Sequence, residues 1–131
     1  MKRKAIIVDK NIHSTTFIMV DIGNAKDILP YIMSEGIDKE FKEIRALLKE
    51  NLRNKEKYCK ADVLNKAKNM FEMRFIKGDR NDRIYCQEIS IVSRRFIVMV
   101  ELFQGKKSQD IPKKMKNRIE TMGGYDYELE Y

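Results

Sequence analysis

The sequence predicts an α+β domain in which helices precede a small antiparallel β-sheet. Apolar residues recur at helical spacing between residues 37 and 52, and from Phe71 onward the apolar period changes to two. In addition, 131 residues with 43% hydrophobic composition suffice for one compact core and leave little room for a second. We therefore expect a single domain over residues 1–131.

The N-terminal part begins with short β-rich runs. Residues 4–8 and 15–20 are separated by a polar segment and predict a first strand or hairpin. Asn24 is placed to cap a short helix through Ser34, in which Pro30 is tolerated only near the start.

A longer amphipathic helix is expected from Asp38 to about Lys57, because its apolar residues share one face and its charges fill the other. The polar residues 58–69 allow another short helical turn before the sheet begins.

The sheet is expected to be a meander of three strands. The strand from Phe71 places Glu72 and Arg74 on one face, and turn residues 77–82 return the chain antiparallel at Arg83. In the second strand one face is mostly polar, and it carries Arg83 and Tyr85.

After a turn at residues 93–95, the nearly continuous apolar run 96–103 predicts a central strand buried on both faces. A helix capped by Asp110 then ends at Gly123, and residues 125–131 suit a short edge strand or a docking tail.

The charge is strongly basic and unevenly distributed. Lys and Arg outnumber Asp and Glu by 27 to 20, which gives a net charge of +7 and favours nucleic acid, the ribosome or another anionic surface as partner. Within residues 106–118 only Asp110 opposes a cluster of cations, which favours a phosphate-binding surface over plain solvation. The cluster consists of Lys106, Lys107, Lys113, Lys114, Lys116 and Arg118.

Several classes of protein are disfavoured. A single histidine, His13, and two distant cysteines, Cys59 and Cys86, lack metal-ligand or redox spacing, so we expect free thiols, no metal and no cofactor. Because no apolar run approaches the roughly 20 residues needed to cross a bilayer, we expect a cytoplasmic protein without a membrane partner.

Four segments occur in an order that resembles the RelE/HigB toxin superfamily, in particular its phage-derived HigB-like branch. They are Phe71-Glu72-Met73-Arg74-Phe75, Arg83-Ile84-Tyr85, the apolar run 96–103, and Lys106-Lys107-Ser108-Gln109-Asp110-Ile111-Pro112. The resemblance covers about residues 68–120. It implies a RelE-like α+β fold, in which a small antiparallel sheet is packed by N-terminal helices and a C-terminal helix.

The resemblance also implies a toxin of a toxin–antitoxin module that cuts messenger RNA on the ribosome, with a cognate antitoxin as partner. Carried over by position, Arg83 and Lys107 would bind the scissile phosphate and Arg74 would brace the site. Lys106 would grip RNA, with Lys113 and Lys114 on the same basic surface, and Tyr85 would stack on a base or orient a phosphate.

Each assignment has a structural alternative. Arg74 can pair with Glu72, Arg83 can pair with Asp79 or Asp82, and Tyr85 can simply pack. The histidine that many active relatives use for proton transfer is not evident, so the general base stays open among Glu72, Glu88, a C-terminal tyrosine and a lysine. The alternative function is a non-catalytic module of the same fold that binds RNA, the ribosome or gyrase.

Overall fold

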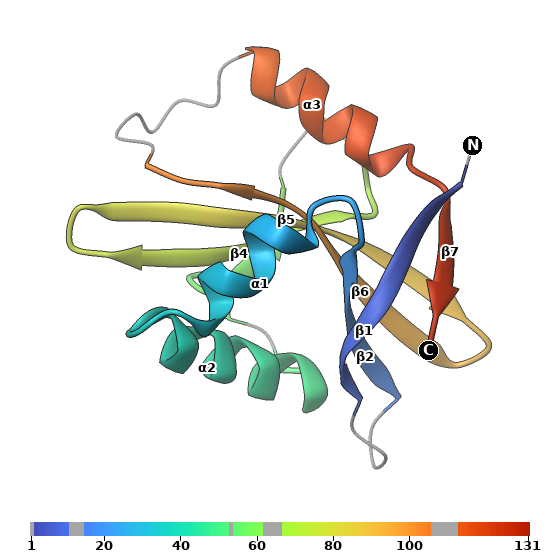
Figure 1. Cartoon of the computed structure of the whole chain (residues 1–131), viewed down its shortest axis with the longest axis horizontal. Helices are drawn as coiled ribbons and strands as arrows, with labels where there is room; N and C mark the ends of the chain where they lie inside the picture. Colours follow the sequence, from blue (N-terminus) through green and yellow to red (C-terminus); the bar gives the residue numbers. More distant parts are fainter. Residues whose placement is uncertain (1, 11–14, 53, 62–66, 106–112) are drawn as a thin grey trace.

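The structure is a computed structural model. It describes residues 2–10, 15–52, 54–61, 67–105 and 113–131, and at positions 10, 113 and 114 it describes the backbone alone. Within these ranges the chain forms seven strands and three helices (Figure 1). In chain order these are β1 (Arg3–Lys10), β2 (Thr16–Asp21), α1 (Ala25–Met33), α2 (Ile37–Lys49), β3 (Tyr58–Lys60), β4 (Met70–Lys77), β5 (Arg80–Ile91), β6 (Arg94–Phe103), α3 (Lys113–Gly123) and β7 (Tyr127–Glu130).

The strands form one mixed sheet in the order β3-β4-β5-β6-β2-β1-β7. The α+β class is confirmed, but the expectation of a small antiparallel sheet is wrong. Strand β2 runs parallel to β6, and β7 runs parallel to β1, so the N-terminal hairpin and the C-terminal tail extend the meander into a larger sheet. Sequence periodicity predicts the faces of a strand but not the neighbouring strands, so it does not predict this extension.

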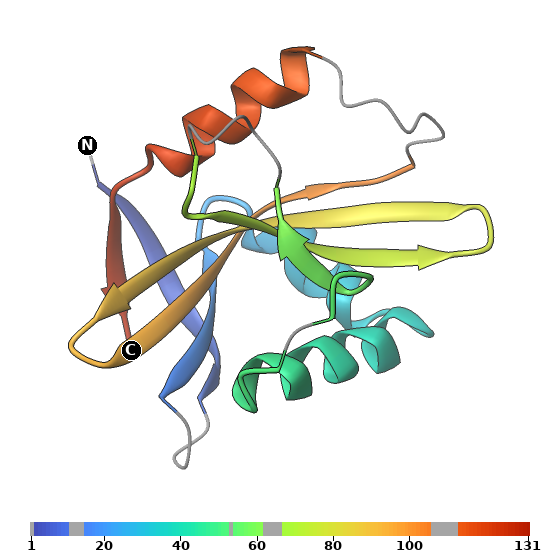
Figure 2. The ribbon, with the colours of Figure 1, turned by 180° about the vertical axis from the view of Figure 1, so that it is seen from behind.

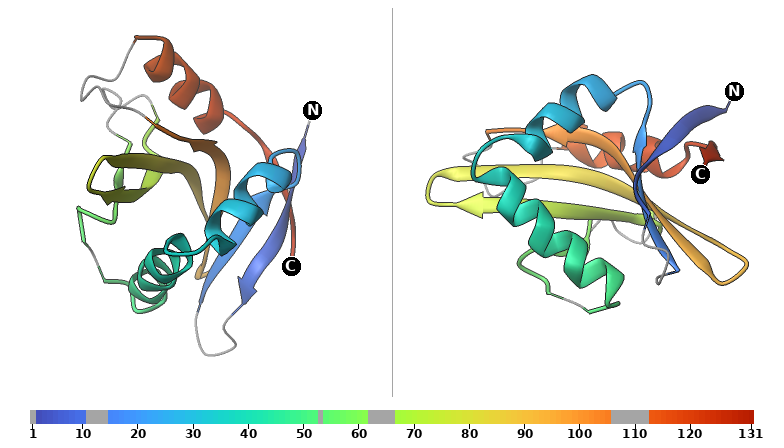
Figure 3. Two further views of the ribbon diagram at one scale, coloured as in Figure 1. Left: turned by 60° about the vertical axis from the view of Figure 1, so that its left-hand side comes forward. Right: turned by 60° about the horizontal axis from the view of Figure 1, so that its bottom comes forward.

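The two faces of the sheet bury separate cores. Helices α1 and α2 cover one face through residues such as Ile28, Ile44 and Phe41, which pack against Phe75 and Ile97. Helix α3 covers the other face, and Figure 3 shows it on the opposite side of the sheet from the α1–α2 pair. We call this second surface the α3-side face.

Helix α1 is confirmed, with a different role for Asn24. Its side chain makes no cap and instead donates to the carbonyl of Val100 at 2.6 Å, which ties the helix start to β6. Pro30 lies well inside the helix, where it removes the donor for the carbonyl of Lys26. Both residues are exposed, so water can satisfy that carbonyl.

Helix α2 is shorter than expected because it ends at Lys49 instead of near Lys57. Asn51 adopts φ 55°, and the amides of Asn51 and Leu52 donate back to the carbonyls of Leu48 and Leu47. This is a Schellman motif, which closes a helix and turns the chain away. Residues 58–60, at the start of the polar stretch, form the edge strand β3. The short helical turn expected around Val63, Leu64 and Ala67 lies mostly outside the described residues.

The meander β4-β5-β6 has the expected order, with tighter turns than expected. The first turn is the pair Gly78 and Asp79, since Lys77 pairs directly with Arg80. The second is Val92 and Ser93, since Ile91 pairs with Arg94. Seen from behind in Figure 2, both hairpins project beyond the body of the sheet.

Helix α3 ends at Gly123 as expected, and its Ile119 and Met122 are fully buried on the α3-side face. The proposed capping by Asp110 lies outside the described residues. The tail forms the edge strand β7, in which Tyr127 is buried and donates to the buried carboxylate of Asp21 at 2.6 Å.

Phe75 is fully buried and Ile76, its neighbour in β4, is 42% exposed. We predict that Phe75→Ala lowers the free energy of unfolding by about 3–5 kcal/mol, because it removes a core ring and leaves a cavity. Ile76→Ala should cost about 0.5 kcal/mol or less. Urea denaturation of the two variants checks this, and equal losses would contradict the assignment of the faces.

Candidate nucleic-acid interface

The pairing register of β4 and β5 places three of the predicted site residues, Arg74, Arg83 and Tyr85, close together on the α3-side face. Across β4 and β5, Arg74 pairs with Arg83 and Glu72 pairs with Tyr85. On the other flank of β4, Cys59 of β3 pairs with Glu72. Three neighbouring strands therefore bring a carboxylate, two guanidinium groups, a phenol and a thiol together.

Glu72 is the centre of this group and is only 6% exposed. Arg83 Nη1 lies 3.2 Å from its Oε2, and Arg74 Nε lies 3.8 Å from its Oε1. The thiol of Cys59 donates to Oε1 at 3.4 Å. We call Cys59, Glu72, Arg74, Arg83 and Tyr85 the Glu72 cluster.

The ion pair expected as an alternative for Arg74 is present, since Glu72 is its carboxylate neighbour. Arg83 has a different partner from the two that the sequence suggested. It pairs across the strands with Glu72, while Asp82 accepts hydrogen bonds from Tyr31 at 2.7 Å and from the amide of Gly105 at 2.9 Å. Asp82 and Arg83 are adjacent in β5 and point to opposite faces of the sheet. Arg83 therefore does join the two strands of the hairpin, but through Glu72 and not through Asp79 or Asp82.

The cluster carries more positive than negative charge, because one carboxylate faces two guanidinium groups. Arg74 Nε is buried and has no hydrogen-bond partner among the described residues, and its Nη1 donates to the carbonyl of Lys55 at 3.5 Å. The side chain of Arg74 is 28% exposed and that of Arg83 is 15% exposed. Arg74 is thus the more exposed of the two cations of the cluster.

Two weak acids of the cluster stay protonated at neutral pH. Burial, reinforced by the negative charge of Glu72, raises the pKa of Tyr85 to about 12. Burial and the same carboxylate raise the pKa of the Cys59 thiol to about 11. Tyr85 is only 2% exposed and its ring lies 6.5 Å from that of Phe103, so packing is part of its role.

Two of the candidate general bases are the carboxylates Glu72 and Glu88. Of these two, Glu72 lies in the cluster. Glu88 is on the opposite face, where it accepts a hydrogen bond from Tyr58 at 2.5 Å. Among the C-terminal tyrosines, Tyr127 is engaged with Asp21, and the ring of Tyr125 lies 4.3 Å from the guanidinium of Arg3.

The basic segment is only partly described. Lys106 and Lys107 lie outside the described residues, and Lys113 and Lys114 form the first turn of α3, where the backbone alone is described. The preceding Gly105 is held by Asp82, the neighbour of Arg83 in β5. The segment that begins at Lys106 therefore starts from a fixed point next to the Glu72 cluster.

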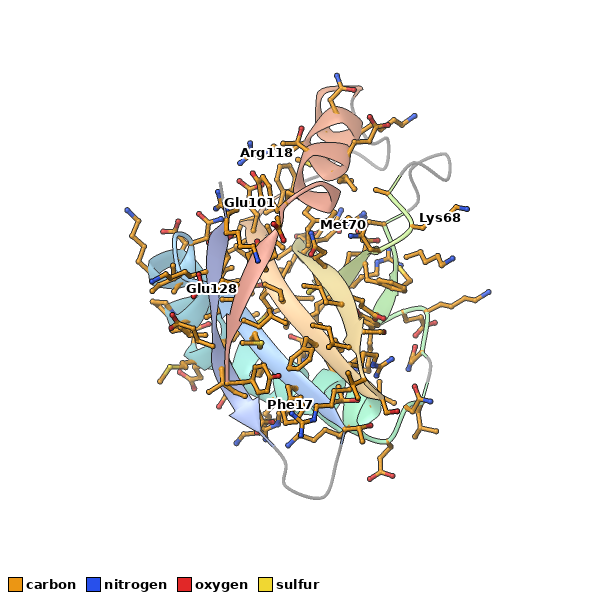
Figure 4. The ribbon with its side chains drawn as sticks, turned by 90° about the vertical axis from the view of Figure 1, so that its right-hand side faces the viewer. Phe17, Lys68, Met70, Glu101, Arg118 and Glu128 are labelled. Atoms are coloured by element: carbon orange, nitrogen blue, oxygen red, sulfur yellow. The ribbon has the colours of Figure 1, made fainter. Side chains whose placement is uncertain are left out.

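Arg118, at the other end of the basic segment, is already paired. It makes two hydrogen bonds to Glu101, at 2.7 and 2.9 Å, and Figure 4 shows the two side chains between α3 and the sheet. Its charge is therefore less available to a phosphate than that of Lys116, which is exposed.

The sequence did not reveal the contributions of Cys59 and Asp82. Cys59 lies in a polar stretch of the sequence, and the pairing of β3 with β4 places it against Glu72. Asp82 falls in the expected turn 77–82, and its polar neighbours Asn81 and Arg83 give no sequence signal of an anchoring role. Both cysteines are free thiols, as expected.

Comparison with known proteins adds nothing to the assignment. No protein-family model matches the chain, and no curated protein matches it significantly. Among the described residues no helix is long and apolar enough to cross a membrane. The same residues contain no cluster of three or more His, Cys, Asp or Glu side chains that could hold a metal ion.

We predict that Glu72→Gln lowers the pKa of Cys59 from about 11 toward its ordinary value of 9.0, because the neighbouring negative charge is lost while burial remains. The pH dependence of thiol alkylation measures this, since Cys86 is fully buried and reacts slowly. Glu101→Gln is the control, and an unchanged Cys59 profile in Glu72→Gln would contradict the contact.

Stability should fall in alkaline solution. The folded-state pKa values of Cys59 and Tyr85, about 11 and 12, exceed the ordinary values of 9.0 and 10.0, so the folded state binds protons more tightly than the unfolded state. Their contribution is complete below about pH 9 and is lost as pH rises through the folded-state values. We expect a lower urea midpoint at pH 10.5 than at pH 8, with a smaller fall in Cys59→Ala.

Proposed function

We propose that this protein is the toxin component of a toxin–antitoxin module and acts on ribosome-associated messenger RNA as a metal-independent endoribonuclease. The observation that carries the proposal is the Glu72 cluster, in which two arginines flank one carboxylate beside the start of a lysine-rich segment. The ordered resemblance to the RelE/HigB toxins and the net charge of +7 support it.

The chemistry needs a proton acceptor, a cation and a proton donor. The ribose 2′-oxygen attacks phosphorus after its proton is taken, the 5′-oxygen leaves with a proton, and a 2′,3′-cyclic phosphate remains. We assign Glu72 as proton acceptor and Arg83, with Lys107, as the cations that neutralise the phosphorane. Tyr85 is the candidate donor because its pKa, about 12, keeps the phenol protonated.

Arg74 has a supporting role in this proposal. Its side chain is partly exposed, which suits the guanidinium to a neighbouring phosphate. Lys106, Lys113 and Lys114 would add non-specific grip on the RNA backbone. The cognate antitoxin would neutralise the same basic surface with acidic side chains.

Burial favours a second candidate function. Glu72 is 6% and Tyr85 2% exposed, so a phosphate reaches them only if the Glu72–Arg83 pair opens. A protein that binds RNA, the ribosome or gyrase through its basic surface, without cleavage, needs no such opening. In that case the Glu72 cluster is a structural ion-pair network.

Primer extension on a defined messenger RNA in a translating extract tests the first candidate. Wild type should produce new ends in phase with codons, and Arg83→Ala/Lys107→Ala should reduce them about 100-fold or more because the phosphorane loses its cations. Lys42→Ala, which removes one exposed charge from α2 on the opposite face, is the control and should cleave normally.

Glu72→Gln separates cleavage from binding. If Glu72 is the proton acceptor, this variant should bind RNA as wild type does and cleave about 100-fold or more slowly. If neither wild type nor variant cuts but both bind RNA with affinity that falls steeply with salt, the binding function replaces the enzyme. Circular dichroism must show that each variant is folded.

A further inference from the structure

The tip of the β5–β6 hairpin has an unfavourable backbone. Val92 and Ser93 adopt φ 45° and 65°, the left-handed region that suits Asn-Gly and penalises a β-branched side chain. The other hairpin of the meander places Gly78, with φ 61°, at the equivalent first turn position. The fold therefore does not require valine at this turn.

The same tip exposes apolar side chains. Val92 is 89%, Tyr131 54% and Ile91 44% exposed, although apolar residues of this size are usually buried. Ile91 pairs with Arg94, whose guanidinium lies 5.8 Å from the ring centre of Tyr131 and 6.0 Å from that of Phe17. Figure 1 shows this hairpin close to the C-terminal end of β7.

These residues form one surface, which we call the hairpin-tip patch: Ile91, Val92, Arg94 and Tyr131. The ring of Tyr131 packs on the buried rings of Phe17 and Phe96, and the three ring centres lie 4.8–6.1 Å apart. Figure 4 shows Phe17 at the opposite end of the α3-side face from Arg118 and Glu101.

Arg94 gives the patch its charge. It is exposed and contacts aromatic faces, and no described carboxylate forms an ion pair with it. A cation seated on aromatic rings at the border of an apolar surface can accept a carboxylate from a partner without moving. The patch is thus complementary to a segment that is apolar in the centre and acidic beside it.

We propose that the hairpin-tip patch is a docking site for an acidic protein segment. The segment places an apolar side chain against Ile91, Val92 and Tyr131 and a carboxylate against Arg94. A second copy of this chain is disfavoured, because two molecules of net charge +7 repel and the patch is small for a stable dimer, which needs about 800 Å² per partner. RNA is the less favoured ligand because Ile91 and Val92 offer it neither hydrogen bonds nor a stacking surface, which leaves only Arg94 and Tyr131 to bind it.

The turn allows stability and docking to be separated. Val92→Asn/Ser93→Gly installs the residues that the turn geometry favours, so the melting temperature should rise. Docking should be lost at the same time, because the exposed apolar side chain is gone. A variant that merely damaged the fold would lower the melting temperature, so the two effects are distinguishable.

The probe is a phage-displayed library of random 12-residue peptides selected on the full chain. Wild type should select peptides that combine Leu, Ile or Phe with adjacent Asp or Glu. Their affinity should fall at least tenfold in Val92→Asn/Ser93→Gly and in Arg94→Ala. Ile76→Thr is the control, since Ile76 is 42% exposed on the other hairpin, and it should bind the peptides normally.

Selection of no common peptide, of basic peptides, or of peptides that bind the double variant equally well would overturn the proposal. A single-stranded RNA measured in parallel should bind wild type and the double variant alike. Loss of RNA binding in the double variant would place the tip in the nucleic-acid interface instead. The proposal does not depend on ribonuclease activity, because neither measurement uses cleavage.

Discussion

The whole structure depends on the burial of β6, which connects the antiparallel meander on one side to the N-terminal hairpin on the other. Phe96, Ile97, Val98, Met99 and Val100 are all fully buried, and their side chains alternate between the core under α3 and the core under α1 and α2. On one flank β6 pairs antiparallel with β5, and on the other it pairs parallel with β2. Loss of this strand would separate the meander from the N-terminal hairpin and from both helical layers.

The local features of the fold were accessible from the sequence, and its long-range pairing was not. The apolar run 96–103 predicts a strand buried on both faces, which is what β6 is, and the period of two from Phe71 predicts which residues of β4 share a face. The parallel pairing of β2 with β6 leaves no mark in either segment. The predicted end of helix α2 near Lys57 is wrong because the conformation of one residue determines this boundary. Asn51 adopts φ 55°, and the helix ends before it.

The candidate site was predictable to a similar degree. Strand alternation predicts that Glu72 and Arg74 share one face of β4 and that Arg83 and Tyr85 share one face of β5. The pairing register of the two strands places these residues side by side on the same face of the sheet. The sequence does not predict which carboxylate forms the ion pair with Arg83. Asp82 is adjacent to Arg83 along the chain, but adjacent residues of a strand point to opposite faces, so the cross-strand Glu72 is the partner.

The Glu72 cluster and the hairpin-tip patch both contain residues that the stability of the fold does not require. A buried ion pair is often no more stabilising than apolar residues of the same volume, and one carboxylate between two arginines leaves Arg74 Nε without a hydrogen bond. Val92 in a left-handed turn is likewise less stable than Asn or Gly would be.

These two sites lie at opposite ends of β6, since Arg83 pairs with Phe103 and Ile91 pairs with Arg94, roughly 30 Å apart for an extended strand. A ligand bound to one site leaves the other uncovered unless it spans the α3-side face. Neither the Arg74 Nε without a hydrogen bond nor Val92 at φ 45° is needed for folding, and two such features at separate places are better explained by two contacts with other molecules than by one. The basic end suits a polyanion, and the apolar end suits an acidic protein segment.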